Sequence, residues 1–325
     1  MIAEMVKENR VLVTGATGFV GRALCKVLIQ EGYIVRALVR RPIDSLTATE
    51  TIVCNYADDE ALYRALTGVD YVIHLAARAH VLSEKNIDPA LAFREVNVDL
   101  SLRLMKLAMT CDVKRLVYVS SIGVNGSFTE GRPFDEQSPP DPDALYAQSK
   151  YEAERALQAQ VIGSSTQLTI VRPPLVYAAE APGNFHRLLR LVRGNMPLPF
   201  ARLRNRRSLI ALENLTSFLE YCLRTEAAAG QTFVISDTES ISTEQLCDSL
   251  ATGMGIKCKQ FYIPQFPVSI AASVLGKKRL YTQLFGDLEI DSRKARELLG
   301  WTPVIEARVA LQRAGALFVH LDDKS

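Results

Sequence analysis

The sequence predicts an α/β fold, a doubly wound parallel sheet of the Rossmann type with a smaller C-terminal substrate-binding domain. Two patterns predict it. Through the first half of the 325-residue chain, apolar β-rich runs alternate with helical segments, which is typical of a parallel sheet covered by helices on both faces. In addition, the first apolar run leads into a glycine-rich turn and then a helix, as at the entry to a dinucleotide-binding fold.

The predicted strands are short and nearly continuously apolar, as strands buried on both faces should be. They are expected at residues 10–14, 34–39, 51–54, 71–75, 116–120 and 168–171. The clearest helical segment between them is 91–109, where Leu100 and Leu104 fall on one face. Because ligands of such sheets bind at the carboxyl ends of the strands, the residues that follow each strand are the candidates for function.

The alternation of strands and helices stops after residue 172. Turns that contain proline and glycine then separate short elements, so we expect a dinucleotide-binding Rossmann domain at 1–172 and a substrate-binding domain at 173–325. A helix at 214–223 and a strand at 232–236 are predicted, and segment 211–236 is expected to return to the main sheet. The apolar stretch 266–275 is about half the roughly 20 residues that a membrane span needs, which predicts a buried or surface-lying helix.

Composition excludes several classes of function. Lysine and arginine number 38 against 36 acidic residues, so no global charge favours nucleic acid as a partner. The six cysteines have neither CxxC pairs nor His/Cys spacing suited to zinc, which predicts reduced core thiols and no metal site. The first eight residues are charged and contain no hydrophobic signal segment, and no membrane span is predicted. We therefore expect a cytoplasmic protein.

The turn after the first strand has the pattern GxxGxxG, at Gly15, Gly18 and Gly21. Gly15 lets the backbone turn sharply, Gly18 permits close approach of a pyrophosphate, and Gly21 lets the next helix pack tightly on the sheet. The amides and the positive end of the helix that begins near Phe19 would attract phosphates. The spacing differs from the GxGxxG dehydrogenase fingerprint, so the position between a strand and a helix is what indicates function.

The end of the second strand bears on which dinucleotide is bound. The fingerprint expects an acid there to bind the ribose hydroxyls, but residues 32–43 contain no Asp or Glu. The strand ends instead in Arg40 and Arg41, and two guanidinium groups suit a 2′-phosphate by charge and by bidentate geometry. NADP(H) is therefore favoured and NAD(H) is possible, with two solvated arginines as the alternative interpretation.

A tyrosine and a lysine four residues apart, Tyr146 and Lys150, follow the fifth strand. The spacing places both on one helix face, where an ammonium would lower the pKa of the phenol from about 10 toward working pH. Such a tyrosine can exchange a proton with a carbinol or carbonyl while hydride moves to or from nicotinamide. Ser120 and Ser121 close the strand, and either hydroxyl could hydrogen-bond the substrate oxygen. Asn97, a poor helix former within a predicted helix, is either tolerated or anchors the active site.

Together these motifs resemble the extended short-chain dehydrogenase/reductase family of nucleotide-sugar epimerases, dehydratases and reductases. The resemblance spans nearly the whole chain, with the motifs in the family's order. Beyond the glycine turn, it is carried by His74-Leu75-Ala76-Ala77, Asn97-Val98, Ser120-Ser121, the Tyr146/Lys150 pair, Arg172-Pro173-Pro174-Leu175-Val176-Tyr177 and Leu299-Gly300-Trp301-Thr302-Pro303.

The resemblance implies a role for each matching residue. Tyr146 would be the acid/base, Ser121 rather than Ser120 would steady the substrate oxygen, and Lys150 would bind the nicotinamide ribose. Asn184 and Arg207 would bind the nucleotide diphosphate, so the substrate would contact Ser121, Tyr146, Asn184 and Arg207. The cofactor would contact Gly15, Thr17, Gly18, Phe19, Val20, Arg40, Arg41, Asn55, Tyr56, Leu75, Ala76, Ala77, Tyr146, Lys150 and Pro173. A homodimer is implied by analogy alone.

Some positions depart from the family pattern. Asn55 stands where the family usually has an aspartate near the adenine, Asn125-Gly126 replaces Tyr-Gly, and Leu175 replaces an asparagine frequent in epimerases. The substrate pocket is therefore expected to differ from that of a standard UDP-galactose epimerase. Segment 182–207 and the C-terminal half are similar to bacterial surface-polysaccharide enzymes that act on UDP-N-acetylated sugars.

Three functions stay open. The favoured hypothesis is a 4-ketoreductase of surface-polysaccharide biosynthesis, in which NADPH delivers hydride to C4 of a UDP-4-keto-6-deoxy-N-acetylhexosamine and Tyr146 protonates the oxyanion. The alternative is a 4-epimerase acting on UDP-GlcNAc or UDP-glucose, which oxidises C4 and returns the hydride to the other face. A dehydratase is disfavoured because Ile122-Gly123 replaces its usual Asp-Glu pair. The third hypothesis, a non-catalytic NADP(H)-binding protein, is disfavoured by the intact Ser/Tyr/Lys set.

Overall fold

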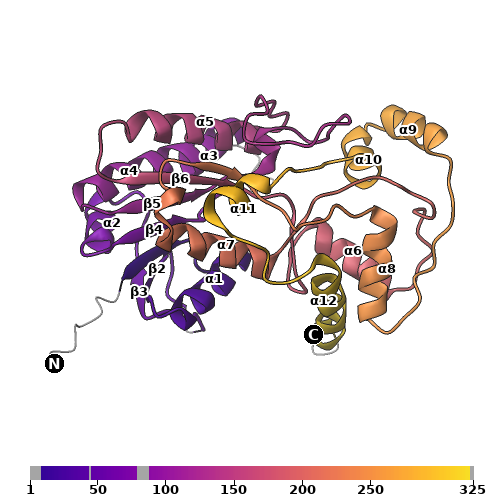
Figure 1. Cartoon of the computed structure of the whole chain (residues 1–325), viewed down its shortest axis with the longest axis horizontal. Helices are drawn as coiled ribbons and strands as arrows, with labels where there is room; N and C mark the ends of the chain where they lie inside the picture. The colour runs from indigo at the N-terminus through magenta and orange to yellow at the C-terminus, as the bar shows by residue number, and fades with distance from the viewer. Residues whose placement is uncertain (1–8, 44, 79–87, 323–325) are drawn as a thin grey trace. The chain divides into compact units, whose positions relative to one another are not determined.

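The structure is a computed structural model that describes residues 9–43, 45–78 and 88–322 (Figure 1). In chain order its first elements are β1 (Arg10–Thr14), α1 (Phe19–Gln30), β2 (Ile34–Val39), β3 (Glu50–Val53), α2 (Asp59–Leu66), β4 (Tyr71–His74), α3 (Pro89–Arg94), a π-helical turn (Glu95–Asp99), α4 (Leu100–Thr110), β5 (Arg115–Val119), a 3₁₀ turn (Ile122–Val124), α5 (Leu145–Gln160) and β6 (Gln167–Arg172). The later elements are β7 (Val176–Tyr177), α6 (Asn184–Arg193), β8 (Ile210–Ala211), α7 (Leu212–Arg224), a 3₁₀ turn (Glu226–Ala228), β9 (Thr232–Val234), α8 (Thr243–Gly253), α9 (Gln265–Val274), α10 (Lys278–Phe285), α11 (Arg293–Leu299) and α12 (Ala307–Asp322).

Two compact units are formed by this chain. The first comprises residues 1–124, 142–172 and 216–233, and the second comprises 125–141, 173–215 and 234–325. Each unit therefore draws on segments that are far apart in the sequence.

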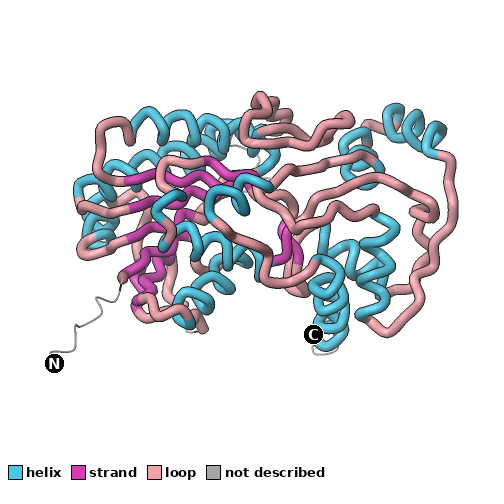
Figure 2. The backbone as a smooth tube through the Cα atoms, in the orientation of Figure 1, coloured by secondary structure: helices cyan, strands magenta, loops and turns pink. Residues whose placement is uncertain are grey.

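The first unit contains a seven-stranded sheet in the order β3-β2-β1-β4-β5-β6-β9, and every pairing from β3 to β6 is parallel (Figure 2). This confirms the predicted α/β fold. The order reverses direction between β1 and β4, which is the switch point at which such sheets bind ligands. Thr14 is level with Leu38 of β2 and His74 of β4, so the three strands end together at one edge.

Helices cover this sheet because its strands are apolar on both faces. On one face, α2, α4 and α5 contribute buried side chains to a core shared with the strands, among them Leu62, Leu104 and Leu157 against Leu12 and Leu116. On α7, Phe218 packs edge-to-face against Phe233 of β9, with ring centroids 5.4 Å apart. Burying a leucine side chain contributes roughly 1.5–3 kcal/mol, so these contacts outweigh the local preferences of single residues.

The predicted helix at 91–109 is wrong as one continuous α-helix. The structure has α3 and α4 joined by a π-helical turn, Glu95–Asp99, which widens the backbone around Asn97. A π turn inserts one extra residue into the helical repeat and commonly occurs at functional sites. The side-chain contacts of Asn97, described below, explain why the regular repeat is interrupted here.

The second unit packs around α8 and α12. A Cβ added at Gly315 would lie 2.3 Å from the carbonyl oxygen of Leu250, so glycine is required for these two helices to approach so closely. A buried polar cluster lies elsewhere in this unit: the Tyr177 hydroxyl donates to Asp237 at 2.7 Å, and the Asn214 amide donates to the other carboxylate oxygen at 2.7 Å. Burial raises the pKa of Asp237, and these two donors satisfy its oxygens.

Candidate active site

The glycine turn forms a backbone cradle at the N-terminus of α1. Gly15 has φ +69°, and a Cβ there would lie 2.8 Å from the amide nitrogen of Ala76. A Cβ at Gly21 would lie 2.2 Å from the carbonyl oxygen of Gly15, to which Gly18 donates its own amide at 2.9 Å. Only glycine fits at these contacts, and the cradle presents the positive end of a 12-residue helix. This is the arrangement that binds a dinucleotide pyrophosphate.

The carboxyl ends of β1 and β4 are tied together beside this cradle. Thr14 Oγ1 lies 2.6 Å from His74 Nδ1 and accepts the amide of Ala76 at 3.1 Å. Burial lowers the pKa of His74 to about 3, so the imidazole is neutral. It serves as a hydrogen-bonding link between β4 and β1. These bonds set the path of Leu75, Ala76 and Ala77 along the switch point.

The residues predicted to contact the adenosine end of the cofactor follow β2 and β3 in the chain. Arg40 and Arg41 follow β2 and are exposed. Asn55 is also exposed, and its side-chain oxygen accepts the amide of Ala57 at 3.1 Å. Tyr56 is half-buried; burial raises its pKa, and a hydrogen bond with the backbone of Gly15 acts in the opposite direction. Tyr56 therefore reaches the glycine cradle, whereas the two arginines leave their guanidinium groups open to solvent.

Tyr146 and Lys150 both lie on the first turns of α5, as their spacing predicts. Lys150 is 1% exposed; its Nζ donates to the carbonyl oxygen of Val119 at 2.8 Å and lies 4.5 Å from the ring centroid of Tyr118. Lys150 thus reaches the carboxyl end of β5, next to the predicted catalytic serines.

The predicted lowering of the tyrosine pKa is wrong for this structure. Burial raises the pKa of Tyr146 to about 12 and lowers the pKa of Lys150 to about 7, with Glu154 partly opposing the fall. Removal from water disfavours both the phenolate and the ammonium. Because the ammonium is directed at Val119 and the Tyr118 ring, desolvation dominates over attraction between the pair.

Ser121 lies where β5 passes into the 3₁₀ turn. Its Oγ accepts the amide of Gly123 at 3.1 Å, and a Cβ at Gly123 would meet the Cβ of Ala147 at 3.3 Å. The absence of a side chain at Gly123 therefore lets the serine turn pack against the start of α5, beside Tyr146. Ser120 differs because its hydroxyl is buried and finds no hydrogen-bond partner among the residues that the structure describes.

Asn97 anchors this site, which decides between the two interpretations of its place in a helix. It is fully buried; its amide donates to Ser149 Oγ at 2.9 Å, and its oxygen accepts the amide of Arg78 at 2.8 Å. Ser149 in turn donates to the carbonyl oxygen of Tyr146 at 2.7 Å. Asn97 thus links the segment after β4 to the first turn of α5, where Tyr146 and Lys150 lie.

In the second unit, the two predicted diphosphate-binding residues both contact the region of α10. Asn184 begins α6, and its amide donates to Gln283 at 3.2 Å. The Arg207 guanidinium donates to the carbonyl oxygens of Gly286 at 3.1 Å and Thr282 at 3.4 Å, and burial lowers its pKa. Asn184 and Arg207 are therefore brought to one element. Pro173 follows β6 and is buried.

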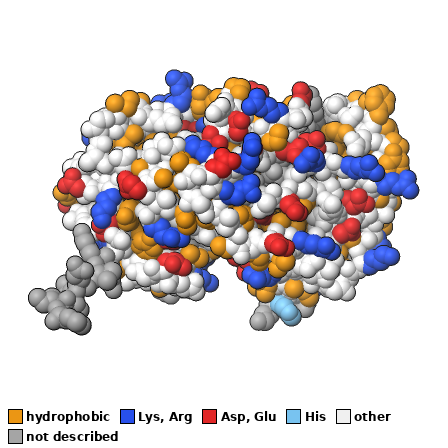
Figure 3. All heavy atoms as spheres, in the orientation of Figure 1, with side chains coloured by type: hydrophobic (Ala, Val, Ile, Leu, Met, Phe, Trp, Pro, Cys, Tyr) orange, Lys and Arg blue, Asp and Glu red, His pale blue; other side chains and the backbone are white. Residues whose placement is uncertain are grey.

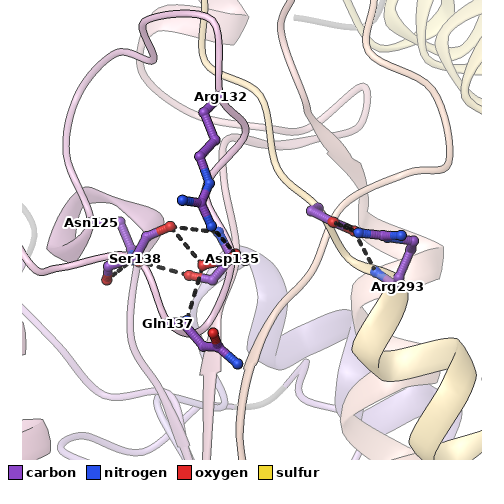
Figure 4. Close-up of polar contacts among 7 residues, drawn as sticks. Asn125, Arg132, Asp135, Gln137, Ser138 and Arg293 are labelled. Atoms are coloured by element: carbon purple, nitrogen blue, oxygen red, sulfur yellow. Dashed lines mark hydrogen bonds and ion pairs between the residues drawn. The ribbon is translucent and has the colours of Figure 1, made fainter.

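The departure from the family pattern at Asn125 has a structural role (Figure 4). Asn125 is buried, and its amide donates to the carbonyl oxygens of Ser138 at 3.2 Å and Asp135 at 3.4 Å. The Ser138 hydroxyl donates to Asp135 at 2.7 Å, which holds the pKa of that carboxyl below its usual value. Asn125 therefore closes the loop 125–138 on itself.

Comparison with known proteins identifies the family. Residues 11–241 match the sequence model of the NAD dependent epimerase/dehydratase family. The chain is 34% identical over 319 residues to a UDP-glucose 4-epimerase from Vibrio cholerae, with 97% of each chain covered. The chain belongs to this NAD dependent epimerase/dehydratase family. It is thus an enzyme of the extended short-chain dehydrogenase/reductase type, and the predicted family is confirmed.

Two further proteins are similar to this chain. An Escherichia coli O157:H7 N-acetyl-α-D-glucosaminyl-diphospho-ditrans,octacis-undecaprenol 4-epimerase is 26% identical, covering 83% of this chain and 82% of its own. The solved structure of a UDP-glucuronic acid 4-epimerase from Bacillus cereus in complex with NAD has a TM-score of 0.76 at 19% identity, covering 96% of this chain and 99% of that one. The structural likeness shows that the epimerase fold is shared over the whole chain.

Some residues of the family site had no role assigned from the sequence. Thr14 and His74 tie β1 to β4, Ser149 carries the link from Asn97, and Glu154 pairs with Arg172 in a buried salt bridge. Ser149 could have been noticed as a polar residue inside the Tyr-x-x-x-Lys motif. The partner of Arg172 carried no such signal, because the two residues lie on different elements and meet only in the folded chain.

Proposed function

We propose that the protein is a nucleotide-sugar 4-epimerase that acts on UDP-glucose or UDP-GlcNAc. One observation carries the proposal: Ser121 follows β5, and Lys150, one helix turn after Tyr146, donates to Val119 at the end of that strand, in a chain 34% identical over 97% of its length to a UDP-glucose 4-epimerase. The same residues would serve a ketoreductase. The likeness to that epimerase is therefore what favours the 4-epimerase over the 4-ketoreductase.

In this mechanism Tyr146 takes the proton of the C4 hydroxyl and later returns one, while the Ser121 hydroxyl donates to the same oxygen as negative charge develops. A bound nicotinamide cofactor would accept the C4 hydride and give it back. Lys150, whose pKa is about 7, divides between ammonium and amine near neutral pH. Asn97 holds the helix turn that carries both Tyr146 and Lys150.

The glycine cradle, Leu75, Ala76 and Ala77 would hold the cofactor, and the other predicted contacts are proposed with them. Asn184 and Arg207 would hold the diphosphate of the substrate through an amide and a guanidinium, both suited to phosphate oxygens. Their contacts with Gln283 and Gly286 keep the two side chains ordered. Arg207→Ala should therefore raise KM for the nucleotide sugar more than it lowers kcat.

The cofactor is proposed to be NADP(H) or NAD(H), with NADP(H) favoured by Arg40 and Arg41. Both are exposed at the end of β2, where a 2′-phosphate would approach. The family name and the NAD-bound relative support NAD as the competing choice. Titration with each oxidised dinucleotide separates them: Arg40→Ser/Arg41→Ser should weaken NADP binding about tenfold or more and leave NAD binding unchanged. Equal effects on both would contradict the assignment.

The exposed arginines also support the 4-ketoreductase as a second candidate, because a reductase consumes its cofactor and commonly uses NADPH. One labelling experiment distinguishes the two functions. Purified protein is supplied with C4-deuterated UDP-glucose or UDP-GlcNAc, and the products are separated and examined by mass spectrometry. An epimerase returns the deuterium to C4 of the inverted sugar without net formation of reduced nicotinamide. A reductase leaves these substrates unchanged and oxidises NADPH only when a UDP-4-keto sugar is present.

Replacement of the proposed acid/base tests the mechanism, and a second tyrosine on the same helix provides the matched control. Tyr146→Phe should lower turnover by at least about 100-fold while cofactor affinity is retained, because only the proton transfer is removed. Tyr151→Phe, on the same helix, should keep wild-type turnover. Wild-type rates in the Tyr146 variant would refute the mechanism.

A further inference from the structure

The helix α9 is an exposed apolar surface that the proposed reaction does not use. Phe266, Ile270 and Val274 are spaced four residues apart and so share one face of the helix, and they are 77%, 50% and 81% exposed. Leu275, just after the helix, and Tyr262, just before it, are also exposed. Of the two predicted positions for this segment, buried or surface-lying, the structure has the surface one.

This surface is too short to be a membrane span. α9 has 10 residues, and no helix among the described residues is long and apolar enough to cross a bilayer. Exposed apolar side chains gathered on one face usually mark an interaction site in a folded protein. Figure 3 shows hydrophobic side chains over the region of α9, with lysine and arginine side chains beside them.

The segment around α9 is predominantly basic. Residues 249–286 contain five lysines and arginines and no Asp or Glu. Asp248 and Asp287 lie just outside this segment, and Asp248 accepts the side-chain amide of Gln260 at 2.8 Å. Lys257, Lys259 and Lys277 are exposed on the segments that flank the helix. Arg202 adds a further guanidinium 5.9 Å from the ring of Tyr262. A partner of negative charge is therefore complementary to this surface.

The two serine hydroxyls of the helix are bonded within it. The Ser269 hydroxyl donates to the carbonyl oxygen of Phe266 at 2.8 Å, and the Ser273 hydroxyl donates to that of Ser269 at 2.9 Å. Hydroxyls bonded in this way can leave water without exposing an unpaired donor. The apolar face can thus enter a medium that offers few hydrogen bonds.

From these three observations we propose that α9 and its flanking lysines dock the protein on the surface of an anionic phospholipid bilayer. Phe266, Ile270 and Val274 enter the boundary between headgroups and acyl chains. The charges come from the segments on either side of the helix, because α9 itself has no charged side chain. Lys257, Lys259 and Lys277 contact the anionic headgroups, where each lysine strengthens binding by about fivefold. Binding is reversible, because a single short helix with three apolar side chains anchors weakly. It is weakened by salt, because the lysines contribute through charge.

The test is sedimentation of the full-length protein with vesicles. The wild type should pellet with an equimolar mixture of phosphatidylcholine and phosphatidylglycerol, and should stay in the supernatant with phosphatidylcholine alone or at high salt. Phe266→Ser/Ile270→Ser/Val274→Ser should weaken binding at least about tenfold. The matched control Leu91→Ser/Ile162→Ser/Val304→Ser removes three equally exposed apolar side chains outside the helix and should bind as the wild type does.

A second variant keeps the proposal testable if the α9 triple variant fails to fold. Lys257→Gln/Lys259→Gln should weaken binding by up to about twenty-fold through charge alone. Wild-type protein that does not pellet with the anionic vesicles, or equal losses in the α9 and control variants, would overturn the proposal. A dimer in solution that the α9 triple variant converts to monomers, without vesicle binding by the wild type, would assign the face to a second copy instead.

Discussion

Replacing Lys150 with methionine should stabilise the fold at neutral pH while removing activity. The side chain is almost fully buried, and burial lowers its pKa from 10.5 to about 7. The unfolded chain therefore binds more protons than the folded chain between these two values. By linkage, the free energy of unfolding of the wild type rises as pH increases through this window, and the full penalty is present below it.

The size of the effect follows from the shift. One pKa unit corresponds to about 1.4 kcal/mol, so the buried ammonium costs about 5 kcal/mol at low pH and about 4 kcal/mol at neutral pH. Methionine has a similar length and carries no charge, but it leaves the Val119 carbonyl without its 2.8 Å donor. That loss costs about 1–3 kcal/mol. A net gain of about 1–3 kcal/mol is expected at neutral pH. Near pH 9.5 the gain falls to about zero or becomes a net loss of up to about 1.5 kcal/mol.

Urea unfolding of both proteins between about pH 6 and 9.5 measures the difference, with two-state behaviour checked for each unit. Turnover in the epimerase assay should fall at least about 100-fold, since the proposed contact of Lys150 with the nicotinamide ribose is lost. Lys106→Met on α4 is the control, because Lys106 is exposed and its replacement should alter neither stability nor pH dependence. A variant that is less stable than the wild type at pH 6, with a parallel pH profile, would refute the burial argument.

Three further outcomes are expected. Gly21→Ala would place a Cβ 2.2 Å from the carbonyl oxygen of Gly15 and so displace the cradle. Dinucleotide binding, measured by calorimetry, should weaken at least about tenfold. Unchanged affinity would show that the cradle is not part of the cofactor site. Asn97→Ala breaks the bonds to Arg78 and Ser149 and should cost about 2–4 kcal/mol in urea unfolding, with a larger loss in kcat than Ser149→Ala causes. His74, whose pKa is lowered from 6.5 to about 3, binds protons only on unfolding between these values, so stability is lost as pH falls below 6.5. The loss should reach about 2 kcal/mol at pH 5, and a His74→Gln variant with the same acid sensitivity would contradict it.

The strands of the sheet were predictable because their residues are buried on both faces and leave a continuous apolar signal. β1 and β2 have the predicted bounds. Where an end of β4 or β5 differs from the prediction, it does so by one residue. The glycine turn was equally predictable from the sequence, since the steric need for glycine at Gly15 and Gly21 is local to the backbone. α9 was visible as an apolar stretch, but its exposure was not, because periodicity alone does not show what covers a helix.

Local sequence did not determine how desolvation would shift the pKa values of the proposed catalytic pair. Tyr-x-x-x-Lys established that Tyr146 and Lys150 share a helix face, but the direction of each pKa shift depends on the β5 carbonyl and the Tyr118 ring that surround the lysine. Asn97 was ambiguous for the same reason. Its partners, Arg78 and Ser149, are 19 and 52 residues away along the chain.

By itself, then, the amino-acid sequence predicted the buried strands, the glycine turn and the candidate set Ser121, Tyr146 and Lys150, because each signal is local to one strand, one turn or one helix. Only the tertiary structure decided that Asn97 anchors α5, that burial opposes ionisation of both Tyr146 and Lys150, and that α9 presents its apolar face to solvent. These properties depend on which distant segments remove a side chain from water, and that is a consequence of packing.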